Sequence, residues 1–127
     1  MGHTVLSLGL HPSAVDLSRF PDIDEETLRA RIAAGEAELR EAGYDIATCQ
    51  VTADPDEAEQ RIRSCLADGS FQVVMIGAGL RMVAEHTVLF ERAVNLLNEL
   101  SPGIVFCFNT SPDTTIDALR RWARPAG

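Results

Sequence analysis

Residues 71–77 read FQVVMIG and residues 103–109 read GIVFCFN, and these two almost continuously apolar runs decide the fold. Strands that are covered on both faces have this pattern, because helices lie on both sides of a parallel sheet. Two further apolar runs, residues 4–10 and 44–51, precede them, and helical segments alternate with all four. This alternation is typical of βαβ units and predicts an α/β domain with a four-stranded parallel sheet.

Right-handed crossovers limit the order of these strands. The order 2-1-3-4 lets the first and last helices cover one face of the sheet while the two middle helices cover the other. Residues 1–127 are therefore expected to form a single three-layer α/β/α sandwich. In such open sheets a ligand binds beyond the carboxyl ends of the strands where the order reverses, which here is between the first and third strands.

Boundary signals predict four helices. The first is expected to start with Asp22 and Glu25 and to stop at Gly43, and the second combines an N-cap at Asp54 with Pro55 in its first turn. The third is expected within residues 83–100, and the last begins at residues 111–113, which read SPD.

Composition excludes several classes of function. The net charge of −8 argues against nucleic-acid binding, which needs a basic surface. All eleven basic residues are arginines, so Schiff-base chemistry and lysine-dependent phosphate sites are excluded. The three cysteines form no CxxC pair and are expected to be buried free thiols in a reducing compartment. Neither a signal peptide nor a membrane span is visible, which predicts a cytoplasmic protein.

Small and polar residues gather at the predicted reversal point. Gly9 lies near the end of the first strand, Gly77 and Gly79 follow the third, and Arg81 comes two residues after Gly79. The guanidinium of Arg81 suits a carboxylate or phosphate, while glycines let main-chain groups approach a ligand. Alternatively, the glycines make a tight turn and Arg81 pairs with a carboxylate, at Glu85 or Asp113.

Two more candidates follow the fourth strand. Asn109 and Thr110 are not needed to cap the last helix, so they are expected to orient a ligand. The predicted ligand-binding residues are thus Gly77, Gly79, Arg81, Asn109 and Thr110. The cofactor stays unknown, since Met82 replaces the third glycine of a dinucleotide motif and no FMN or metal motif is present.

An enzymatic alternative rests on two histidines. His11 follows the first strand and His86 lies near the start of the third predicted helix. If both faced one pocket they would make a general acid–base couple for a lyase, isomerase or hydrolase. A structural role for each histidine is the competing interpretation.

Two segments each have two possible interpretations, one functional and one structural. The connection of residues 11–22 is long and could pack Val15, Leu17 and Phe20 over the rim, either as a lid or as a structural loop. The helix within residues 83–100 is apolar on more than one side, which favours a homodimer face or, alternatively, a long buried helix. A pure assembly protein is therefore a third functional class.

The predicted architecture resembles the Rossmann-like (flavodoxin-like) group, although the acidic pair and lysine of response-regulator receivers are missing. Residues 71–122, with VVMIGAGLR and FCFNTSPDTTIDALRRW, resemble a group of small bacterial proteins that carries no assigned activity. That resemblance transfers no functional residues. The leading hypothesis is binding of a small, anionic metabolite at the reversal point.

Overall fold

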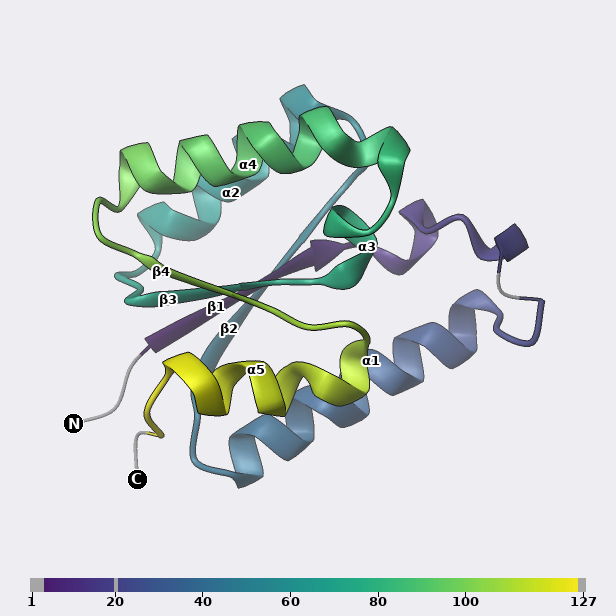
Figure 1. The fold of residues 1–127 in the computed structure, drawn as a ribbon, viewed down its shortest axis with the longest axis horizontal. Coiled ribbons are helices and arrows are strands. Elements are labelled where there is room, and N and C mark those ends of the chain that lie inside the picture. The colour runs from purple at the N-terminus through teal and green to yellow at the C-terminus, as the bar shows by residue number, and fades with distance from the viewer. Residues whose placement is uncertain (1–3, 20, 126–127) are drawn as a thin grey trace.

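A computed structural model describes residues 4–19 and 21–125 of the chain, and it contains one parallel sheet (Figure 1). The strand order is β2-β1-β3-β4, so the predicted fold class and the predicted order are confirmed. The strands are β1 (Thr4–Leu10), β2 (Asp45–Val51), β3 (Val73–Ile76) and β4 (Val105–Phe108).

Helices cover both faces of the sheet, and the two helical layers are visible above and below it in Figure 1. One layer contains α1 (Glu25–Glu41) and α5 (Thr115–Trp122), and the other contains α2 (Pro55–Ala67) and α4 (Thr87–Leu100). This is the predicted assignment of helices to faces. Shorter helical segments are η1 (Pro12–Ala14), η2 (Leu17–Arg19), α3 (Ala78–Arg81), η3 (Ala84–His86) and η4 (Pro112–Thr114).

Helix boundaries agree with the predicted signals at most ends. The side chain of Asp54 accepts a hydrogen bond from the Asp56 N–H at the start of α2, and Gly43 follows α1 with a φ of 92°, which favours glycine. The acidic start predicted for α1 is present at Glu25, the first helical residue, whereas Asp22 lies before the helix and Asp24 is the N-cap. The hydrogen bond from Thr27 lowers the pKa of Asp24, since the carboxylate accepts it.

The third predicted helix is divided in the structure. Its regular part begins at Thr87, and η3 precedes it. A separate single turn, α3, directly follows β3 and was not predicted. Gly77, its N-cap, has no side chain that could accept a hydrogen bond from the turn, so the start signal in the sequence is weak.

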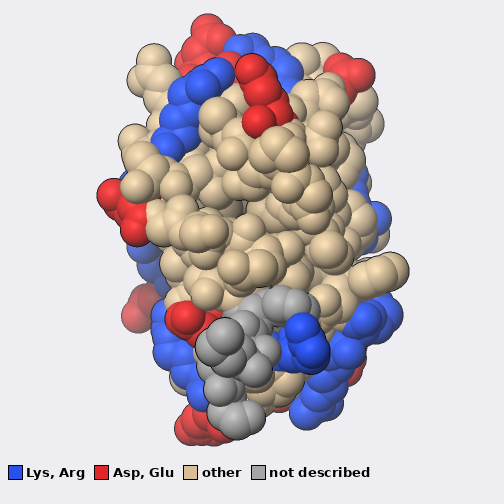
Figure 2. All heavy atoms as spheres, turned by 90° about the vertical axis from the view of Figure 1, so that its left-hand side faces the viewer, with Lys and Arg blue, Asp and Glu red and all other residues tan. Residues whose placement is uncertain are grey.

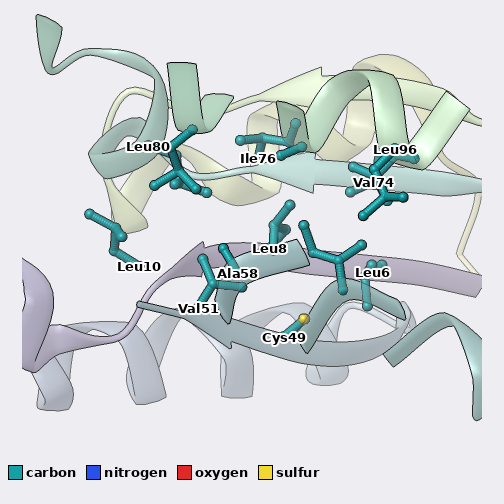
Figure 3. Close-up of a cluster of buried hydrophobic side chains, with 14 of the residues drawn as sticks. Leu6, Leu8, Leu10, Cys49, Val51, Ala58, Val74, Ile76, Leu80 and Leu96 are labelled. Atoms are coloured by element: carbon teal, nitrogen blue, oxygen red, sulfur yellow. The ribbon is translucent and has the colours of Figure 1, made fainter. Parts of the chain in front are cut away.

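Two hydrophobic clusters fill the spaces between the layers. Alternate strand residues enter each cluster, as the pleat of a strand requires. The cluster under α2 and α4 includes Leu6, Leu8, Val74, Ile76 and Leu97, and several of its members are drawn in Figure 3. The cluster under α1 and α5 includes Val5, Leu39, Met75, Cys107 and Leu119.

Most apolar residues of α4 face inward. Leu89, Ala93, Leu96 and Leu97 are buried, whereas Val88 and Leu100 are exposed. Arg92 joins α4 to α2 through charge-assisted hydrogen bonds to acidic side chains of α2, and the bond to Glu59 lowers the pKa of that carboxyl. Burial therefore explains these positions without a partner chain, and the homodimer face stays a prediction.

The end of the molecule where the strands begin has an uncharged centre with charged side chains around it (Figure 2). Three exposed apolar residues lie at the ends of helices or strands, namely Leu100 of α4, Val105 of β4 and Trp122 of α5. In the described part of the chain, no helix has the length and apolar character needed to span a bilayer.

Candidate functional site

A cavity of about 360 Å³ opens at the carboxyl ends of the strands, between the sheet and α1. This is the reversal point between β1 and β3 at which the sequence predicts a site. Four of the five predicted binding residues line it: Gly77, Gly79, Asn109 and Thr110. The cavity thus lies at the position that the strand order predicts for a ligand site.

The cavity exists because small or polar residues of β1 and β2 face α1. Ser7 and Gly9 of β1 and Thr48 and Gln50 of β2 line it, while the larger side chains that alternate with them belong to the cluster on the opposite face. A Cβ atom built on Gly9 would meet nothing within 4 Å. Gly9 therefore keeps open a space that almost any other side chain would enter.

The wall opposite the sheet is mostly apolar. Leu28, Ile32 and Leu39 of α1 line it, and Val15 and Leu17 of the connection before α1 complete it. The predicted packing over the rim is therefore present for Val15 and Leu17, whereas Phe20 lies outside the described residues. Whether it also opens and closes like a lid stays a prediction.

Asn109 connects the segments around the cavity mouth. Its Oδ1 accepts the main-chain N–H of Ala78 at 2.9 Å, and its Nδ2 donates to the Thr115 hydroxyl at 2.8 Å. Asn109 is only 6% exposed, so both amide atoms are removed from bulk water. The side chain thereby fixes the starts of α3 and α5 against each other, a role that sequence reasoning missed.

Thr110 lies at the exposed edge of the cavity. Its hydroxyl is 3.1 Å from the Thr114 hydroxyl, and its N–H donates to the same oxygen at 2.9 Å. The hydroxyl of Thr110 is thus held in place and remains exposed beside the opening.

Arg81 is not among the described residues that line the cavity. Its guanidinium donates to the Asn109 carbonyl at 2.9 Å and lies over the Phe108 ring, with Cζ 5.4 Å from the ring centroid. Its Nε is buried and has no hydrogen-bond partner among the described residues. These contacts make Arg81 a support for Asn109 rather than a free cation in the cavity.

Replacing Arg81 with alanine is expected to lower the free energy of unfolding by about 2 kcal/mol, because a charge-assisted hydrogen bond and a cation–π contact are lost. Urea denaturation measures this change. Arg63→Ala, at an exposed position of α2, serves as the control and should change stability by less than about 0.5 kcal/mol. Unchanged stability combined with lost affinity for an anion would instead support direct binding by Arg81.

The two histidines lie elsewhere on the rim. Nδ1 of His11 accepts the N–H of Ser13 at 3.1 Å and so caps η1, while His86 ends η3 and precedes α4. Neither histidine is among the described lining residues. The acid–base couple therefore stays a prediction without support from the cavity.

Arg31 is a cavity residue that sequence reasoning missed. It is the only cation among the described residues of the lining, and its side chain makes no ion pair or hydrogen bond with another described residue. Glu36 also lines the cavity, but it accepts a hydrogen bond from Thr48 at 3.0 Å and lies 3.9 Å from the Arg40 guanidinium. The charge of Arg31 is thus available to a ligand, whereas that of Glu36 is partly balanced.

Neither a protein-family model nor a curated protein sequence matches this chain. The resemblance of residues 71–122 to a group of small bacterial proteins therefore stays a prediction.

Proposed function

We propose that this protein binds a small metabolite with an apolar body and an anionic end in the cavity beside Gly9. The main observation behind this proposal is the open space beside Gly9. This space is part of the cavity of about 360 Å³ at the point where the strand order reverses. Small-molecule sites are typically concave, mostly apolar and about 300–1,000 Å³ in volume, with a few polar groups that fix orientation.

In a protein without a ligand, an unfilled space of this kind would lower stability. Protein interiors are close-packed, and a glycine within a strand weakens it because no side chain packs there. Gly9 has no positive φ that would require glycine, so an apolar side chain would fill the space and strengthen β1. A ligand that occupies the cavity would account for a glycine at this position.

The lining suggests how such a ligand would lie. Its apolar body would pack between Gly9 and the α1 residues Leu28 and Ile32, which together exclude water from it. Its anionic end would accept hydrogen bonds from the fork of the Arg31 guanidinium at the edge of α1. The main chain of Gly77 and Gly79 would bound the other side, and Arg81 would act indirectly by holding Asn109.

The expected strength of each contact between ligand and protein depends on how exposed the protein residue is to solvent. Arg31 is exposed, so its ion pair is screened by solvent and contributes less than burial of the apolar body. We therefore expect carboxylates with an aliphatic or aromatic body to bind better than sugar phosphates or nucleotides.

A thermal-shift screen that pairs each apolar carboxylate with its alcohol analogue tests this function. A matching carboxylate should raise the melting temperature by several degrees at about 100 times its Kd. Arg31→Gln should weaken carboxylate binding about five-fold and leave the alcohol unaffected, because only the anion uses the guanidinium. Arg120→Gln, an exposed arginine of α5, is the matched control. If no compound stabilises the protein, or if Arg31→Gln and Arg120→Gln behave alike, the proposal for the anionic end fails.

We also propose a bacterial origin, a cytoplasmic location and a homodimer through residues 83–100. For the homodimer, Phe90 of α4 packs against Phe108 with ring centroids 6.2 Å apart, so its ring already has a partner within the chain.

A further inference from the structure

Two cysteines lie in contact on the face of the sheet away from the cavity. Cys49 of β2 and Cys65 of α2 place their sulfur atoms 2.6 Å apart. A covalent S–S bond measures about 2.05 Å, so the separation is only about half an ångström longer. The neighbouring side chains of Cys49 are drawn in Figure 3, where its sulfur lies within the buried cluster.

The strand β2 and the helix α2 direct the two cysteine side chains toward each other. Cys49 points toward α2 because it alternates with Thr48 and Gln50, which face the cavity. Cys65 follows Ala58 and Ile62 on the helix at the spacing of one face, and both of these residues are buried against the sheet. Neither strand nor helix has to rearrange to bring the sulfur atoms together.

We propose that Cys49 and Cys65 form a reversible disulfide bond by exchange with a small-molecule disulfide. This inference is independent of the proposed ligand, because it concerns the opposite face of the sheet. It differs from the sequence-based expectation of three buried thiols, since Cys65 is only half-buried.

The different exposure of the two thiols sets the order of steps. Cys65 loses its proton to solvent, and its thiolate attacks one sulfur of the small disulfide, which forms a mixed disulfide and releases one small thiolate. Cys49 then loses its proton and attacks the Cys65 sulfur, so that the Cys49–Cys65 bond forms and the second small thiolate leaves. Both leaving thiolates take up protons, so two protein thiols are oxidised and one small disulfide is reduced to two thiols.

Burial supports this order. It raises the pKa of the Cys49 thiol well above its usual range, which disfavours the thiolate and makes Cys49 a poor first attacker. Its attack in the second step is intramolecular and starts from contact distance. Cys107 provides an internal comparison: burial raises its pKa to about 11, and it belongs to the other hydrophobic cluster.

Incubation of the full chain with oxidised glutathione, followed by an acid quench, alkylation and peptide mapping, tests the proposal. We expect two of the three thiols to be lost, a peptide linked through Cys49 and Cys65, and reversal by dithiothreitol. Closing this span of 16 residues should raise the melting temperature on the order of 10 °C. Three free thiols at every glutathione ratio, or a link to Cys107, would overturn the proposal.

Three variants separate the steps. Cys49→Ser should trap glutathione on Cys65 as a stable mixed disulfide, because the second attacker is missing. Cys65→Ser should stay unmodified, and Cys107→Ser should form the bond as the wild type does. Glutathione on Cys49 in the Cys65→Ser variant would contradict the order of attack, and the wild-type peptide map decides the pairing even if a variant fails to fold.

Discussion

Replacing Gly9 with leucine is expected to abolish ligand binding, with at least about a hundred-fold loss of affinity, while the fold is kept. The new side chain would enter the cavity, where an added Cβ meets nothing within 4 Å, and would occupy the position of the apolar body. Stability should rise by about 0.5–1 kcal/mol or more, because a glycine is removed from a strand interior and apolar surface is buried.

Titration calorimetry with the best carboxylate and urea denaturation measure the two effects. Ala47→Val, at an exposed position of the neighbouring strand, is the control and should bind as the wild type does. Gly9→Leu protein that binds at full strength would place the ligand elsewhere. Protein that no longer folds would show that the space beside Gly9 is not available.

Asn109→Ala is expected to lower the free energy of unfolding by about 2–4 kcal/mol, because it leaves buried polar partners without hydrogen bonds. The main-chain N–H of Ala78 loses its acceptor and the hydroxyl of Thr115 loses its donor. Since these groups begin α3 and α5, we also expect weaker ligand binding through a less ordered cavity mouth.

The midpoint of urea denaturation, at an unchanged m-value, reports this loss of stability. Asn95→Ala on the exposed face of α4 is the matched control and should stay within about 0.5 kcal/mol of the wild type. An equally small effect of Asn109→Ala would mean that Asn109 does not hold the two helix starts together.

The sheet and the location of the cavity could be predicted because both depend on strong, regular signals. The apolar runs of residues 71–77 and 103–109 are long enough to indicate buried strands, and right-handed crossovers then leave few orders. Once the order reverses between β1 and β3, Gly9 and Gly77 must lie at the same edge. Their proximity thus follows from topology alone.

The chemistry of the site depends on side-chain packing, which a sequence pattern does not contain. Arg29, Arg31 and Arg40 all lie on α1, and only the packing of this helix over the sheet brings Arg31 to the cavity. Arg81 was expected to face a ligand, yet the unpredicted turn α3 directs it onto Asn109 and Phe108. The contact between Cys49 of β2 and Cys65 of α2 could not be predicted for the same reason, because it depends on how α2 packs on the sheet.

A crystal structure of the protein with its best-binding carboxylate tests the central claim most directly. We predict that the apolar body lies beside Gly9, between the sheet and α1, and that the carboxylate lies within hydrogen-bonding distance of the Arg31 guanidinium. A carboxylate bound at Arg81 outside the cavity, or a cavity that holds only water at a saturating ligand concentration, would contradict it.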